Sequence, residues 1–387
     1  MKKFLLGSTA IVAAAAVAAP AVAAEKIQLS VGGYMQQYIG FASNEDDAAR
    51  DYRSFDVQSD TEVHFAGSTT LDNGLKFAVK IEMEADGEDT NGTIDESWLE
   101  VSSESFGSLK LGYDDPVTAL AHNTSPNYGP GYGDADTWIS DSTVSKENDS
   151  YVLLRQGDEA KISYFTPRFF GFQAGATYVP QLEDGRTSGN GSNATDIPNA
   201  VNGGGDAWFA VLNYKGEFGG VGIGADYGYG RTSGGRASVT SGVPAGEVQV
   251  SANDAAIESA EGHQVGLKVS YAGFEIGGAY QYSNFTFGKG YTGSAASEGS
   301  VWEVGAGYSQ GPWGVSVGYM QSRLTGSIAD PDEDEWDVVA VSGKYNLGPG
   351  IDVHGSVYYV DQEDEGKVDA NYNDGGWAVV AGFNLSF

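Results

Sequence analysis

The chain has no cysteine and few cations, and both absences narrow its possible roles. Without cysteine, neither a disulfide framework nor a thiolate metal site can form. Its 387 residues include 21 Lys and Arg against 53 Asp and Glu, which gives a formal net charge of -32. A nucleic-acid partner would need a basic surface, so this charge argues against nucleic acid as a ligand.

Long apolar runs are also missing, except at the N-terminus. There, two lysines precede an Ala-rich run from Phe4 to Pro20, and small residues follow up to Ala24. This order is typical of a secretory signal peptide, so we predict that residues 1–24 are cleaved; an uncleaved anchor is the alternative. The mature chain, 25–387, has no run of about 20 apolar residues, which a transmembrane helix would need. Any passage through a membrane must therefore use a closed β-barrel.

Strict alternation of apolar and polar residues is the main pattern that is present. Between Gly74 and Glu84, one face carries Leu75, Phe77, Val79, Ile81 and Met83, and the other carries Lys76, Lys80, Glu82 and Glu84. The pattern recurs at 27–36, 315–319, 351–359 and 377–387. Such segments predict barrel strands with an apolar face toward lipid and a polar face toward a water-filled lumen. The 56 Gly suit tight turns and crowded lumen positions.

The connections between these segments alternate in length. Short turns rich in Gly, Pro or Asn fall at 72–74, 105–107, 168–171, 216–220, 272–273, 311–312 and 348–350. Long polar loops fall at 42–51, 87–93, 114–157, 181–205, 232–260, 284–299, 324–333 and 362–373. Seven turns and eight loops give fifteen connections and hence sixteen strands, a size that leaves an aqueous channel. We therefore predict an all-β, antiparallel transmembrane barrel of about 16 strands, with short periplasmic turns and long external loops.

Two further residue groups have alternative interpretations. The acidic loop segments at 44–47 and 330–335 are either solvated surface or Ca²⁺ sites, because carboxylate oxygens suit that ion. Six tryptophans near predicted strand ends are expected to form interfacial girdles: Trp98, Trp208, Trp302, Trp313, Trp336 and Trp377. Of the four histidines, His64 and His354 fall on lumen faces, two residues from Glu62 and Asp352. None has a recognised ligand-pair spacing and no G-x-S-x-G motif occurs, so we do not predict catalysis.

Several segments in order resemble the Gram-negative general-diffusion porins, most closely the sixteen-stranded type of alphaproteobacteria. They are the mature start at 28–34, the hairpin at 67–75, the strand at 106–112 and the terminal strand 382–387, which ends in Phe387. The resemblance implies a homotrimeric outer-membrane channel in contact with lipid and lipopolysaccharide. It also implies that Phe387 is an assembly signal and that the third loop, 114–157, folds into the lumen and narrows it.

The same resemblance implies that charges across this constriction create a transverse field. The acidic candidates on the loop are Asp114, Asp115, Asp134, Asp136, Asp141, Glu147 and Asp149. The basic candidates on the pore wall are Lys76, Lys80, Lys110, Arg50, Arg53 and Arg155. Because charged rings bias ion passage, we expect passive diffusion of small hydrophilic solutes and ions with a preference for cations and no required cofactor. A substrate-selective channel and a structural or adhesive barrel are the alternatives.

Overall fold

The computed structural model describes ten stretches of the chain: 26–44, 54–86, 94–132, 135–139, 159–180, 205–233, 257–287, 298–325, 333–364 and 375–387. The predicted signal peptide, 1–24, lies outside these residues. Within them, neither helix is long and apolar enough to cross a membrane.

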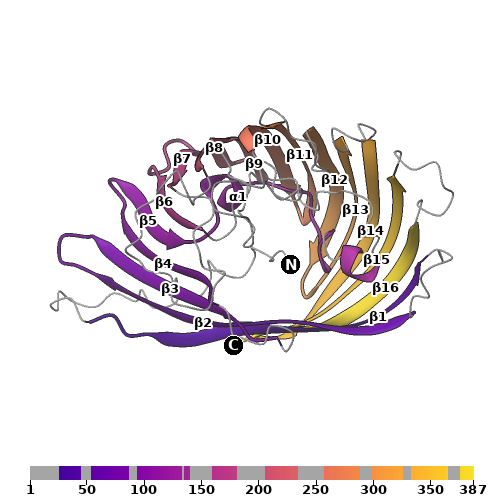
Figure 1. Cartoon of the computed structure of the whole chain (residues 1–387). Helices are drawn as coiled ribbons and strands as arrows, with labels where there is room; N and C mark the ends of the chain where they lie inside the picture. Colours follow the sequence, from indigo (N-terminus) through magenta and orange to yellow (C-terminus); the bar gives the residue numbers. More distant parts are fainter. Residues whose placement is uncertain are drawn as a thin grey trace, which may run out of the picture.

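Sixteen antiparallel strands form a closed barrel, in which each strand pairs with its neighbours in sequence and β1 pairs with β16 (Figure 1). The first eight are β1 (Ser30–Asn44), β2 (Phe55–Thr70), β3 (Lys76–Glu84), β4 (Ile94–Ser103), β5 (Gly107–Tyr113), β6 (Ala160–Phe165), β7 (Phe172–Val179) and β8 (Asp206–Phe218). The other eight are β9 (Val221–Ser233), β10 (Ile257–Tyr271), β11 (Phe274–Phe287), β12 (Glu298–Gln310), β13 (Trp313–Thr325), β14 (Glu333–Gly348), β15 (Ile351–Asp364) and β16 (Gly375–Ser386). The predicted fold and strand number are confirmed.

The connections follow the predicted alternation of short turns and long segments. Between β10 and β11, a two-residue turn has φ of 49° at Ala272 and 87° at Gly273, as a type I′ hairpin requires. The segments 94–102 and 206–215 alternate poorly in sequence, yet they form β4 and most of β8. The barrel closes beside the C-terminus, where Phe387 and Gly33 exchange two backbone hydrogen bonds of 3.0 and 3.1 Å.

The outer face of the barrel is apolar and exposed, as the period of two predicts. In β13, Val315 and Val317 are exposed, whereas Ser316 and Ser322 on the alternate face are buried. The exposed set continues on other strands and includes Leu212, Val265, Leu267, Ile276, Val304, Val341 and Val357. Lipid contact of this face stabilises the barrel in a membrane, and in water the face would drive aggregation.

Part of the inner face is apolar as well, contrary to the simple rule of a polar lumen. A buried cluster inside the barrel contains Tyr38, Ala42, Tyr132, Ala135, Trp138, Ile139, Val301, Met320, Trp336, Val338, Ala340, Tyr358, Val360, Ala378 and Val380. Trp336 is 0% exposed, so its expected place in an interfacial girdle is wrong. Its neighbours include residues of the third loop, which covers this side of the lumen.

The described part of the third loop contains two short helices, α1 (Val117–Leu120) and α2 (Ala135–Trp138). Figure 1 shows α1 inside the ring of strands, next to β7 and β8. From there the chain runs along the inner wall toward β14 and β15. The prediction that this loop folds into the lumen is confirmed for its described residues.

Candidate functional site

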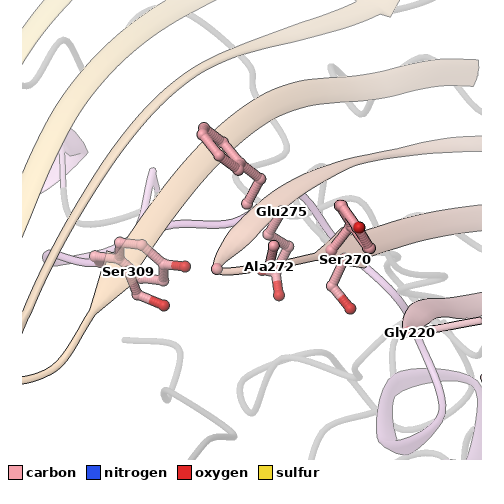
Figure 2. Close-up of a pocket in the computed structure, with 9 residues that line it drawn as sticks. Gly220, Ser270, Ala272, Glu275 and Ser309 are labelled. Atoms are coloured by element: carbon pink, nitrogen blue, oxygen red, sulfur yellow. The ribbon is translucent and has the colours of Figure 1, made fainter.

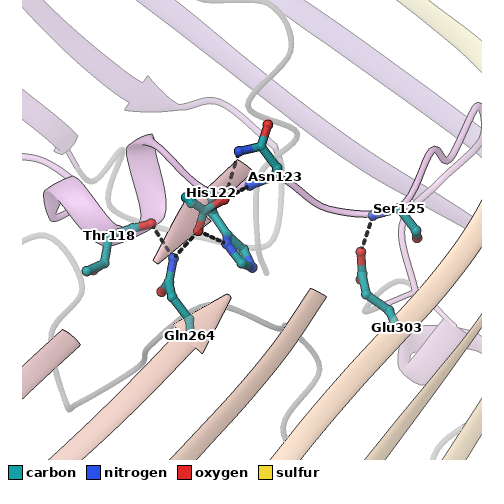
Figure 3. Close-up of polar contacts among 7 residues, drawn as sticks. Thr118, His122, Asn123, Ser125, Gln264 and Glu303 are labelled. Carbon is teal, nitrogen blue, oxygen red and sulfur yellow. Dashed lines mark hydrogen bonds and ion pairs between the residues drawn. The ribbon is translucent and has the colours of Figure 1, made fainter. Parts of the chain in front are cut away.

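The loop enters the barrel through contacts with β7 and β10. Pro116 precedes α1, and the Val117 backbone N–H donates to Thr177 Oγ1 at 3.0 Å. The Thr118 carbonyl accepts a hydrogen bond of 2.9 Å from Gln264 Nε2 (Figure 3). These bonds satisfy backbone groups that would otherwise be buried without partners, so they fix the position of α1 along the barrel wall.

A second anchor is Asp226 of β9, which receives donors from the segment after α1. Its Oδ1 accepts from the Asn123 backbone N at 2.7 Å and from Asn123 Nδ2 at 2.8 Å. Its Oδ2 lies 2.8 Å from His122 Nδ1 (Figure 3). Hydrogen bonds to a carboxylate are about twice as strong as neutral ones, so this residue holds the loop to the wall strongly.

The middle of the loop is bound to β12 and β13. The Ser125 backbone N–H donates to Glu303 of β12 (Figure 3). Ser125 Oγ and Tyr132 Oη lie 3.0 Å apart, and burial raises the pKa of Tyr132 to about 12. Between Ser125 and Tyr132, the Tyr128 backbone N–H donates to Ser316 Oγ of β13 at 3.0 Å.

The end of the described loop packs on β14, β15 and β1. Tyr358 Oη donates to the Pro130 carbonyl at 2.8 Å, and Lys344 Nζ lies 4.4 Å from the centre of the Tyr128 ring. Trp138 of α2 lies against Gly40 of β1. We call the lumen faces of β7–β15 the covered wall, because most of the described contacts between the loop and the barrel lie on them.

Glycine leaves the space that side chains of the loop occupy on the covered wall. A Cβ atom at Gly318 would lie 1.7 Å from Tyr132 Oη, and one at Gly224 would lie 2.4 Å from Asn123 Oδ1. Real Cβ atoms do not approach other atoms this closely, so a larger residue at either position would displace the loop. The crowded lumen positions expected from the glycine content are thus places where loop and wall meet.

The lumen faces of β2–β5 have a different character, and we call them the open wall. Glu62 lies opposite Glu84, and His64 lies opposite Glu82, in the register of β2 and β3. Tyr34 Oη donates to Glu62 Oε1 at 2.8 Å and lies 3.0 Å from an oxygen of Asp60. Acidic side chains therefore dominate this part of the wall.

Two lysines, one on β5 of the open wall and one on the neighbouring β6, hold the start of the loop to the barrel. Lys110 Nζ lies 2.5 Å from Asp114 Oδ2, and Lys161 donates to the Asp114 backbone carbonyl. Lys110 Nζ also lies 4.4 Å from the centre of the Trp98 ring, in a cation–π contact. Trp98 therefore faces the lumen, and its expected place in an outer girdle is wrong.

The predicted constriction residues fall into three groups. Asp114, Asp115, Lys76, Lys80 and Lys110 are described, and Lys80 forms an ion pair with Glu82. The backbone of Asp136 lies in α2, but its side chain is outside the described atoms. Asp134, Asp141, Glu147, Asp149, Arg50, Arg53 and Arg155 lie outside the described residues. The structure thus brings Lys110 and Asp114 together, and the roles of all thirteen in selectivity stay predictions.

Sequence reasoning missed the wall residues that bind the loop. Asp226, Gln264, Glu303 and Tyr358 all face the lumen and contact the loop backbone or side chains. The signal for Asp226 is its position between Ala225 and Tyr227 in an alternating strand. An acid at a lumen position of a strand is visible in the sequence, but its loop partner, about a hundred residues away, is not.

A shallow polar hollow of about 170 Å³ lies where the loop meets the turn between β10 and β11 (Figure 2). Tyr128, Ser270, Glu275 and Ser309 are among the residues that line it. Burial raises the pKa of the Tyr128 hydroxyl. The hollow lies at the rim formed by the short turns, so it belongs to one mouth of the lumen.

The acidic loop segments that are either solvated surface or Ca²⁺ sites are described only in part. Residues 45–47 and 330–332 lie outside the described chain. At the start of β14, Glu335 forms an ion pair of 2.9 Å with Arg323. Calcium binding by these loops therefore stays a prediction.

A protein-family model described as "Gram-negative porin" matches residues 8–365. A search of curated protein sequences found no match. The fold is similar to that of the anion-selective porin from Comamonas acidovorans, with a TM-score of 0.62 at 17% identity, over 94% of this chain and 100% of that one. It is also similar to OmpT of Vibrio cholerae in its trimer form, with a TM-score of 0.59 at 13% identity, over 95% of this chain and 100% of that one.

A third similar structure is the outer membrane channel DcaP of Acinetobacter baumannii. Its TM-score is 0.56 at 14% identity, over 94% of this chain and 98% of that one. At these identities the three likenesses support the barrel fold. The family assignment depends on the family model.

Proposed function

Since the chain belongs to the Gram-negative porin family and forms a multi-pass diffusion channel of the outer membrane, we propose that this channel prefers cations. Its cargo is small hydrophilic solutes and ions, which pass through the barrel passively. In this proposal, the passage for these solutes lies between the covered wall and the open wall. A constriction with this arrangement needs no reacting group, so we propose that the protein is not an enzyme.

The charge of the open wall carries the proposed preference. Along β2, β3 and β4, carboxylates outnumber lysines, and Lys80 and Lys110 are each paired with an acid. In a narrow wet passage, fixed carboxylates favour cations and repel anions. The anion selectivity in the name of the Comamonas porin describes that protein, because 17% identity supports the fold alone.

We propose an assembly of the kind that is found in this family. The chain forms a homotrimer, as OmpT does in its trimer form, and contacts lipid and lipopolysaccharide through its exposed apolar face. Residues 1–24 direct export, and Phe387 is read during assembly. Calcium at the acidic loops is an optional ligand, not a requirement for the channel.

Single-channel recording of the mature protein in a planar bilayer tests the proposal. We expect conductance in triple steps. In a KCl gradient we expect a reversal potential that lies closer to the equilibrium potential of K⁺ than to that of Cl⁻. The double variant Asp60→Asn, Glu84→Gln should reduce this potential, because it removes two carboxylates from the open wall while keeping side-chain size. The matched control is Asp361→Asn with Glu363→Gln, near the rim in β15. Anion preference of the unmodified channel would overturn the proposed selectivity, and a lack of conductance would overturn the channel.

A further inference from the structure

Three candidate ligand side chains converge on the open wall, and all of them belong to β2 and β3. Glu62 and His64 are two residues apart in β2, so their side chains share the lumen face, and His64 lies directly opposite Glu82 of β3. The spacing of Glu62 and His64 matches no recognised ligand-pair motif in the sequence, and Glu82 joins them only through the pairing of β2 with β3. We propose that Glu62, His64 and Glu82 bind a divalent transition-metal ion of the Zn²⁺ class within the lumen.

The orientation of each carboxylate supports this site. Glu62 directs Oε1 to the Tyr34 hydroxyl at 2.8 Å and Oε2 to His64 Nε2 at 2.8 Å. Glu82 is held in the same way, because Lys80 binds its Oε1 and its Oε2 lies 3.4 Å from His64 Nε2. Each acid thus has one oxygen held by a neighbouring donor and the other directed at the imidazole nitrogen. Residues around metal ligands commonly hold them in this manner.

The distances match the space that such an ion needs. The candidate ligand atoms of the three residues all lie within 4.8 Å of one another. Around a tetrahedral zinc ion, with bonds of about 2.0–2.2 Å, neighbouring ligand atoms are about 3.4 Å apart. The distance from His64 Nε2 to Glu82 Oε2 already has this value, and the one to Glu62 needs a small rotation of a side chain.

The site is held firmly but is reachable from the lumen. The Glu62 and Glu82 side chains are 1% and 7% exposed, whereas His64 is 14% exposed. The Tyr34 ring packs edge-on against the His64 ring, with centroids 6.0 Å apart at 79°. Three protein ligands leave a position for water, as in zinc sites that exchange small ligands.

The donor set selects the class of metal. A neutral imidazole suits Zn²⁺, Cu²⁺ or Ni²⁺, whereas Ca²⁺ and Mg²⁺ prefer oxygen ligands alone. Two other groups of three on this wall contain only carboxylates: Asp60, Glu62 and Glu84, and Glu82, Asp95 and Glu96. His64 therefore distinguishes the proposed site from its acidic surroundings. The site goes beyond the proposed diffusion function and does not depend on the ion preference of the channel.

Isothermal titration of untagged, EDTA-treated mature protein in detergent with ZnCl₂, and separately with CaCl₂, tests the proposal. We expect one Zn²⁺ per chain, and we expect His64→Gln to weaken its binding about tenfold or more. Tyr34→Phe keeps all three ligands and removes only a supporting contact, so it should weaken Zn²⁺ binding by a smaller factor than His64→Gln does. The control is His354→Gln, a lumen histidine of β15 that belongs to none of the metal-capable groups found among the described residues. It should bind Zn²⁺ as the unmodified protein does.

Three outcomes would overturn the site: no Zn²⁺ binding by the unmodified protein, unchanged binding by His64→Gln, or an equal loss in His354→Gln. Heat-modifiable migration on gels shows whether each variant has folded, and Tyr34→Phe provides the test if His64→Gln does not fold. Conductance of every variant is recorded in EDTA, without metal. A channel that conducts but does not bind Zn²⁺ would reject the metal site alone, whereas a barrel that binds Zn²⁺ but does not conduct would reject the diffusion function alone.

Discussion

The covered wall and the open wall belong to one barrel, yet they are built on different chemistry. The covered wall combines glycine with buried apolar residues such as Trp336 and Val338, and its polar residues, such as Asp226, bind the loop. The open wall carries mainly charged side chains, which bind one another, as Lys80 and Glu82 do, or bind the start of the loop, as Lys110 does. A lumen face is therefore polar where water contacts it, and it resembles a protein core where a loop excludes water.

The difference also separates two tasks. On the covered wall, close packing gives the loop one position, because a well-filled interface leaves few alternative arrangements. On the open wall, charge remains near the passage and acts on what passes. Changes on the covered wall should therefore alter stability and channel size, whereas changes on the open wall should alter selectivity.

The largest effect is expected from Trp336→Ala. This side chain is 0% exposed and packs among the apolar residues under the loop. Truncating a buried tryptophan typically costs about 3–5 kcal/mol, through lost contacts and the cavity left behind. Urea unfolding in detergent, followed by tryptophan fluorescence and heat-modifiable migration, should show a clear loss of stability.

Trp377→Ala is the matched control for this change. Trp377 is 48% exposed on the outer face of β16, where lipid or detergent can fill the space that truncation leaves. We expect a smaller loss of stability from this variant. Equal losses from the two variants would show that the interior under the loop is no better packed than the outer surface, and the comparison of the two walls would fail.

The barrel itself could be predicted from the sequence because lipid imposes a simple rule on one face. Lipid-facing residues must be apolar, so Val315 and Val317 alternate visibly with Ser316 and Gly318. No equivalent rule applies to the inner face, where the loop determines which positions are dry. The sequence of β14 could not show which face Trp336 lies on, because both faces of this strand carry apolar residues. Trp336 lies on the lumen face, opposite to the face that contacts lipid.

The next effect is expected from Gly318→Val. Its Cβ atom would lie 1.7 Å from the Tyr132 hydroxyl, so the Tyr132 side chain must shift and its contact with Ser125 is disturbed. Overpacking of this kind costs about 1–3 kcal/mol, which is enough to favour displaced loop positions. Single-channel recordings should show a changed mean conductance and more open-channel noise.

Gly343→Val on β14 is the control, since its Cβ would meet the nearest atom at an ordinary 3.6 Å. It should conduct as the unmodified channel does. If Gly318→Val also keeps the unmodified conductance and noise, the loop does not depend on the glycine at that place.

From the sequence, only those contacts of the candidate site could be predicted that join residues close together in the chain. Lys110 and Asp114 lie four residues apart and pair directly, and both were named from the sequence. The Tyr34, Glu62 and Glu82 contacts need the register of three strands, which depends on turns and pairing. The bonds between Asn123 and Asp226 span more of the chain still, and no local pattern connects them.

The smallest effect, and the one that tests the open wall, is expected from Lys110→Met. This change removes the cation that lies 2.5 Å from Asp114 while keeping a long apolar side chain against Trp98. One uncompensated charge acts with about 1 kcal/mol at about 4 Å in water, so the permeability ratio of K⁺ to Cl⁻ should rise by at most about fivefold. Lys76→Met removes the same charge from β3, nearer the short-turn rim, and should raise the ratio less. An equal rise in both variants would show that total lumen charge sets selectivity, whereas a fall in the ratio for Lys110→Met would contradict the role of the open wall.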